Sequence, residues 1–109
     1  MKLIPFLSLL IAPVLGEFLE RMEIGTNEEF ICSYVKPIVE SELSRTFSTF
    51  KPVSYKVETG TGTTYLMQIA TETDEVLHLK IFLGVEEPPK LIGVISNLST
   101  MDELEDFYN

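Results

Sequence analysis

The hydrophobic pattern of this chain changes its period near Pro52, and this change constrains the fold more than any other feature. Before that point, apolar residues recur every three to four positions, as on one side of an amphipathic helix. After it, apolar and polar residues alternate, which is typical of half-buried strands. The sequence therefore predicts one helix followed by strands. Its 109 residues suffice for one domain with one hydrophobic core.

The predicted helix begins at Thr26 or the next residue. Thr26 and Glu29 have the spacing of a capping box, in which each satisfies a free backbone N–H near the start of the helix. Pro37 lies in the middle of the segment. Because proline lacks an N–H and clashes with the carbonyl four residues earlier, we expect a kink or a helix in two parts. The breaker-rich residues 46–52 end the helix. Its apolar side consists of Ile31, Tyr34, Val35, Ile38 and Leu43.

Four strands are predicted after the helix, joined by short turns. In the third of them, Leu77 and Leu79 point inward, so that His78 and Lys80 are expected to face solvent. Short connections favour antiparallel neighbours, and a sheet with one apolar face needs a cover. The prediction is therefore an α+β fold, with one kinked α-helix packed across a four-stranded antiparallel β-sheet. We expect the acidic tail from Asp102 to be frayed. The strands are centred on residues 53–58, 65–70, 77–83 and 91–95.

Acidic residues outnumber basic ones by 17 to 8, which gives a net charge of −9. Neutralising phosphates requires clustered Lys and Arg, so this balance argues against nucleic acid as a partner. It also disfavours anionic membrane surfaces. We predict no cofactor.

Cys32 is the single cysteine and His78 the single histidine. The fold must therefore hold without an internal disulfide, and a thiolate-bound metal site is not expected. An enzymatic alternative pairs the Cys32 thiol with the His78 imidazole. However, His78 is predicted on the strand face that points away from the helix carrying Cys32. We therefore do not expect an enzyme.

The first 16 residues have the layout of a secretory signal. Lys2 gives a basic start, residues 3–15 are mostly apolar, and Gly16 supplies a small residue before Glu17. We expect residues 1–16 to be removed on the way to secretion or to secretory or endolysosomal vesicles, which leaves residues 17–109 as the folded domain. The alternative is an apolar N-terminal strand or partner-binding arm in a cytoplasmic protein. The triplet that begins at Asn97 is a candidate glycosylation site in an exported chain.

The order of elements resembles that of the cystatins, and several motifs narrow the resemblance to the stefins, the type 1 cystatins. Val35-Lys36-Pro37 is similar to the Val-Lys-Pro of the stefin helix. The resemblance covers about residues 26–107 and implies a cystatin-like domain. The other matching motifs are Tyr55-Lys56, Gly62-Thr63 with Tyr65, His78-Leu79-Lys80-Ile81-Phe82, and Asp102-Glu103-Leu104 with Phe107.

The resemblance implies a reversible inhibitor of papain-like cysteine proteases of the cathepsin type. Such inhibitors insert a wedge of three segments into the active-site cleft: an N-terminal trunk with a glycine, a first hairpin and a second hairpin loop. By position, the trunk glycine corresponds to Gly16, which the predicted signal cleavage would remove or leave at the chain end. The implied contacts in the two hairpins are Glu58, Thr59, Gly60, Thr61, Gly62, Val85, Glu86 and Pro88.

The first hairpin departs from the Gln-x-Val-x-Gly of the family. Glu58 replaces glutamine and Gly60 replaces valine, while Gly62 is kept. Burying a valine-sized group contributes about 1.5 kcal/mol or more, which corresponds to about a tenfold gain in affinity. A cystatin-like binding protein that no longer inhibits is therefore the alternative. We expect a monomer, with a hairpin-swapped dimer as a further alternative.

Overall fold

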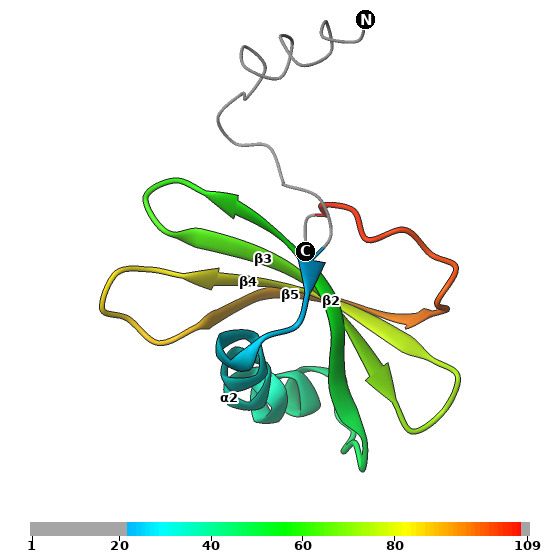
Figure 1. Cartoon of the computed structure of the whole chain (residues 1–109). Coiled ribbons are helices and arrows are strands. Elements are labelled where there is room, and N and C mark those ends of the chain that lie inside the picture. The colour runs from blue at the N-terminus through cyan, green and yellow to red at the C-terminus, as the bar shows by residue number, and fades with distance from the viewer. Residues whose placement is uncertain (1–21, 108–109) are drawn as a thin grey trace, which may run out of the picture.

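The computed structural model describes residues 22–107. Within this part of the chain, five strands form one antiparallel sheet in the order β1-β2-β3-β4-β5, and one helix packs across it (Figure 1). The α+β prediction is confirmed. The predicted count of four strands is wrong, because the short strand β1 adds a fifth. The elements are β1 (Met22–Glu23), α2 (Thr26–Leu43), β2 (Phe50–Thr59), β3 (Thr63–Thr71), β4 (Val76–Leu83) and β5 (Lys90–Leu98).

Helix α2 begins one residue after Gly25, whose backbone is extended. The Gly25 N–H donates to Glu28 Oε1 at 3.0 Å. The capping interaction therefore lies one residue earlier than the predicted pairing of Thr26 with Glu29. The helix continues through Pro37 to Leu43 as one element, so the expected division into two parts is not seen, while a kink stays a prediction. Pro37 is exposed, which places the interrupted hydrogen bond where water can replace it.

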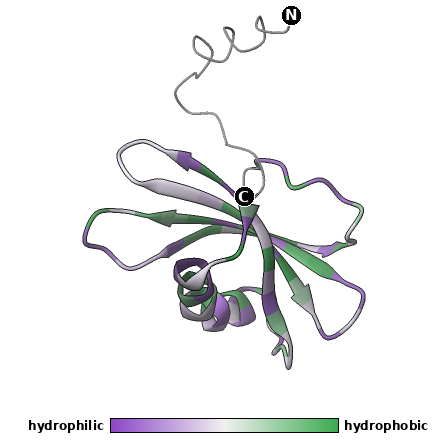
Figure 2. Ribbon diagram, in the orientation of Figure 1, coloured by the Kyte–Doolittle hydropathy of each residue, from purple (hydrophilic) through white to green (hydrophobic). Residues whose placement is uncertain are grey.

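The main core lies between α2 and one face of the sheet. Strand residues that the alternating pattern assigned to the inner face are buried there, together with Ile31 and Val35 of α2. Tyr34 and Ile38, which were predicted on the apolar side of the helix, are instead 42% and 39% exposed, so that part of the prediction is wrong. Figure 2 shows hydrophobic residues interspersed with polar ones along the strands, as a half-buried sheet requires. The buried cluster consists of Ile31, Cys32, Val35, Val39, Phe47, Tyr65, Met67, Ile69, Leu77, Leu79 and Ile81.

The opposite face of the sheet is also covered, which the sequence did not predict. His78 is only 2% exposed, so its predicted orientation toward solvent is wrong. The segment after β5 crosses this face, because Lys80 forms an ion pair with Asp106 at 2.7 Å and donates to the Phe107 carbonyl oxygen at 3.2 Å. Leu104 in this segment is fully buried. The C-terminal segment is therefore packed rather than frayed, and it lies on the side of the sheet away from α2 (Figure 1).

Among residues 22–107, no helix combines the length and apolar character that crossing a bilayer would require.

Candidate functional site

Two loops lie side by side at one end of the sheet, which we call the loop end. The first loop, residues 59–62, connects β2 to β3, and the second loop, residues 84–89, connects β4 to β5. They adjoin because Thr63 pairs with Leu83 across β3 and β4. Figure 1 shows both loops on the same side of the molecule, with the turn between β3 and β4 on the other side. The structure thus brings together the residues of the two hairpins that the sequence singled out.

The direction of strand β1 relates the N-terminal part of the chain to the same loop end. Met22 pairs with Tyr55 and Glu23 with Ser54, so β1 runs away from the loop end. Gly16, the third predicted contact segment, lies outside the described residues, as does the whole predicted leader.

The first loop is short and mostly exposed. The Gly60 N–H donates to the Gly62 carbonyl oxygen at 2.8 Å, which closes the turn. No atom lies within 4 Å of a Cβ atom built on Gly60, so a side chain at this position would meet no steric obstacle. Glu58 and Phe82 are two of the residues that line a recess of about 180 Å³ beside the loop.

Gly62 makes the closest approach at the loop end. A Cβ atom built on it would lie 2.5 Å from Cζ of Phe82 and 2.7 Å from the Leu83 carbonyl oxygen. Neither distance is compatible with a real carbon atom, and the backbone oxygen cannot rotate away as a side chain can. A glycine is therefore required here by packing.

The second loop presents an apolar tip with charged neighbours. Val85 is 74% exposed, and Glu86, Glu87 and Pro88 are exposed as well. Glu86 adopts a left-handed backbone conformation with φ of 61°, which turns the chain sharply at the tip. Pro89 is buried at the base of the loop.

Phe82 was missed as a residue of the loop end. The sequence placed it in a strand motif, and nothing in its own spacing distinguishes it from other strand residues. The signal that could have found it is the pairing of Thr64 with Phe82 in the β3–β4 register, one step inside the loops. That register follows only once the hairpin boundaries are known.

The enzymatic alternative is not assembled in this fold. Cys32 is buried in the core beneath α2, with its Sγ 4.0 Å from the Phe50 carbonyl oxygen. Burial raises the pKa of the Cys32 thiol to about 12, because desolvation outweighs the opposing charge of Lys36. The thiol is thus protonated and a poor nucleophile at neutral pH. His78 lies on the opposite face of the sheet from Cys32, as its alternation with the inward Leu77 and Leu79 requires.

Asn97, the candidate glycosylation site, is exposed near the end of β5. Its backbone has φ of 62°, and its N–H donates to Glu75 Oε2 at 2.8 Å. The adjacent Leu98 pairs with Val76 at the start of β4, which places Asn97 at the end of the sheet opposite the loops. Glycosylation at Asn97 stays a prediction.

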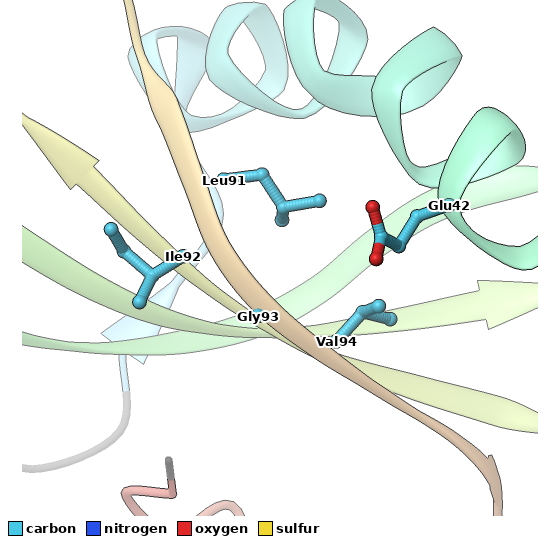
Figure 3. Close-up of a pocket in the computed structure, with 5 residues that line it drawn as sticks. All are labelled: Glu42, Leu91, Ile92, Gly93 and Val94. Carbon is cyan, nitrogen blue, oxygen red and sulfur yellow. The ribbon is translucent and has the colours of Figure 1, made fainter. Parts of the chain in front are cut away.

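A further recess of about 140 Å³ lies between the last turn of α2 and β5 (Figure 3). The Glu42 carboxylate points toward the side of β5 that carries Leu91 and Val94, whereas Ile92 points to the other side of that strand. Glu42 is the one ionisable residue that lines this recess, so we assign no binding role to the recess.

The sequence is similar to several curated stefins and cystatins. It is 32% identical over 79 residues to cystatin-A2 of Dictyostelium discoideum, an alignment that covers 72% of this chain and 82% of that protein. It is 26% identical over 98 residues to stefin-C of Bos taurus, with 87% and 97% covered. It is 29% identical over 80 residues to leukocyte cysteine proteinase inhibitor 1 of Sus scrofa, with 71% and 78% covered. No family model matches the sequence.

These identities extend over most of the chain and agree with the order of one helix and an antiparallel sheet described above. The chain therefore belongs to the stefins, the type 1 branch of the cystatin superfamily.

Proposed function

We propose that this chain is a reversible, competitive inhibitor of papain-like cysteine proteases of the cathepsin type. The observation that carries the proposal is the side-by-side position of the first and second loops at one end of a stefin fold. One of its relatives is named as a cysteine proteinase inhibitor. In the proposed complex both loops enter the active-site cleft, and the N-terminal segment adds contacts beside them.

The loop end has physical properties that suit a cleft. Both loops are short connections between long paired strands, so little conformational entropy remains to be lost on binding. The exposed Val85 offers an apolar group whose burial favours association. Gly60 and Gly62 carry no side chains, which lets the backbone of the first loop approach the protease closely.

The altered first loop predicts a weaker inhibitor than a stefin that carries valine there. Gly60 offers no side chain to bury in the cleft, and the open space around it shows that a larger residue would fit. Glu58 brings a charge that loses hydration on binding unless the protease supplies a partner. Glu58, Glu86 and Glu87 have no ion-pair partner within residues 22–107.

The test is hydrolysis of a peptide substrate by papain and by cathepsin L at increasing concentrations of the folded protein. We expect competitive inhibition at micromolar concentrations or below. Gly60→Val should tighten it about tenfold, because a valine-sized group becomes buried. Asp74→Val, in the turn at the opposite end of the sheet, is the matched control and should leave the inhibition constant unchanged.

Undiminished protease activity at micromolar protein would contradict the proposal. The alternative, a stefin that binds another partner, would be supported if the wild type is silent while the double variant Glu58→Gln with Gly60→Val inhibits.

The proposal includes export of the protein. Residues 1–16 act as a signal peptide, so that the mature chain meets proteases outside the cell or in endolysosomal vesicles, and retention of this segment would indicate a cytoplasmic inhibitor. The N-terminal residue of the protein recovered from an expressing cell tests this directly. A mass decrease on treatment with a peptide N-glycosidase, abolished by Asn97→Gln, tests glycosylation. A single monomeric species on size-exclusion chromatography tests the expected oligomeric state against the hairpin-swapped dimer.

A further inference from the structure

We infer that the ring of Phe82 packs against both loops and is thus a positioning residue that couples their conformations. The effect of this coupling on inhibition rests on the function proposed above. Its effect on the loops themselves does not, because it follows from packing within this chain.

The ring of Phe82 lies close to one glycine of each loop. A Cβ atom built on Gly62 would lie 2.5 Å from Cζ and 2.9 Å from Cε1 of Phe82. A Cβ atom built on Gly84 would lie 3.2 Å from Cε2. Since Cε1 and Cε2 are on opposite edges of the ring, one edge faces the first loop and the other faces the second.

Each loop presents a glycine at its point of contact with this ring. A side chain at either position would displace the ring that the other glycine also approaches. At Gly84 the nearest atoms are the flexible Glu87 carboxylate, at 3.0 Å, and the ring itself. An alanine there can therefore be accommodated by a small movement of these two groups. Gly62 has no such freedom, because the Leu83 carbonyl oxygen blocks it.

The strand pairing fixes the position of the Phe82 backbone within the sheet. Phe82 is paired with Thr64 on one side and with Lys90 on the other. An aromatic side chain has only two torsions to adjust, so the ring acts as a stiff spacer between the loops. The two contact segments of the inhibitor are therefore predicted to move together and not independently.

The most direct test is whether a substitution in the second loop changes the first loop. Gly84→Ala changes the second loop, and the Gly84 Cβ position has no first-loop atom among its three nearest neighbours. We expect it to raise the amide hydrogen-exchange rates of residues 59–62 by about threefold or more, as couplings between residues with a shared partner do. Exchange in residues 72–75, at the opposite end of the sheet, should not change. In a Phe82→Ala background, Gly84→Ala should no longer affect the first loop.

Phe82→Ala should itself raise exchange in both loops and weaken inhibition of papain by about tenfold, because the loops then pay an ordering cost on binding. Phe82→Leu, which keeps a bulky apolar group, should restore most of the affinity. Phe50→Ala is the matched control. Phe50 is another half-buried phenylalanine, paired with Thr71 at the opposite end of the sheet, and its loss should leave loop exchange and inhibition within about twofold of wild type.

The outcomes separate the two claims. If the wild type inhibits no papain-like protease, the proposed function fails. The exchange experiment still tests whether Phe82 couples the two loops. If Phe82→Ala does not fold, Gly84→Ala in the otherwise unchanged chain remains decisive. The inference is overturned if Gly84→Ala leaves exchange in residues 59–62 unchanged, or if Phe50→Ala affects both loops as strongly as Phe82→Ala.

Discussion

Thr63 and Leu83 pair directly across β3 and β4, and each stands next to one of the two loops. This single pairing brings two segments that lie more than twenty positions apart in the sequence to the same end of the sheet. A shift of the register by two residues would separate the loops along the strands by about 7 Å. The geometry of the loop end thus depends on hydrogen bonds in the middle of the sheet.

Val85→Ala should weaken inhibition of papain by about three- to tenfold, because it removes the exposed apolar tip that would be buried in the cleft. Val53→Ala is the control, since Val53 is also an exposed valine, at 50% against 74% for Val85, but lies on β2 away from the loop end. Both variants should keep the free energy of unfolding within about 0.5 kcal/mol of wild type. Equal inhibition constants for the two variants would argue against contact through the second loop.

Gly62→Ala should lower the free energy of unfolding by about 1 to 3 kcal/mol, because an added carbon would overlap Phe82 and the Leu83 carbonyl oxygen. Gly60→Ala is the matched comparison two residues away. No atom lies near its Cβ position, so we expect no loss of stability, or a gain of about 0.5 kcal/mol from the less flexible unfolded chain. Urea denaturation of the two variants measures the difference. Equal stability of both would show that the close approach at Gly62 is not present in solution.

The stability of the protein should decrease above pH 9. The pKa of Cys32 is about 12 in the folded protein against 9.0 for an ordinary thiol. Because the folded state holds the proton more tightly, the contribution of this group is complete below pH 9 and is lost as the pH rises from 9 toward 12. Urea denaturation between pH 7 and pH 10.5 measures this loss.

Cys32→Ala should reduce the loss of unfolding free energy above pH 9. The loss that remains should come from Tyr55 and Tyr65. Burial, with the nearby Glu28 carboxylate, also raises the pKa of both tyrosines. In the folded wild type, iodoacetamide at neutral pH should label Cys32 far more slowly than in 8 M urea. Rapid labelling of the native protein would show that the Cys32 thiol is accessible and would contradict its burial in the core.

Leu104→Ala should destabilise the protein by about 2 to 4 kcal/mol, because it removes a fully buried side chain from the layer beneath the C-terminal segment. Met101→Ala in the same segment is the control. Met101 is 86% exposed, so its truncation should change the free energy of unfolding by less than about 0.5 kcal/mol. A frayed segment would give the same small effect for both variants.

The sequence was sufficient to predict much of the main core, since the spacing of apolar residues indicates which side of a helix or strand is buried. It did not identify Val39 and Phe47 as core residues, and it placed Tyr34 and Ile38 on the buried side although both are exposed. The alternation of Leu77 and Leu79 with His78 correctly divided β4 into two faces. It could not show that the second face is also covered, because the covering residue Leu104 stands alone among acidic residues. Strand β1 was missed for a related reason. Two residues cannot display a period, and their pairing with β2 is a long-range contact.

The candidate site was less accessible to prediction than the fold. Motif resemblance identified the residues of the two loops, and their exposure agrees with their polar and glycine-rich composition. The closeness of Gly62 to Phe82 depends on the register between β3 and β4, to which residues from the whole length of both strands contribute. Local sequence patterns do not specify such a contact.

Binding of the full chain to papain, with the cleft either empty or filled, tests whether the loop end enters the active-site cleft. Isothermal titration calorimetry can compare papain that carries only a small cap on its catalytic thiol with papain that carries a covalent peptidyl inhibitor along the cleft. We expect binding to the capped enzyme and none to the filled one. Equal binding to both forms, or binding to neither, would contradict this expectation.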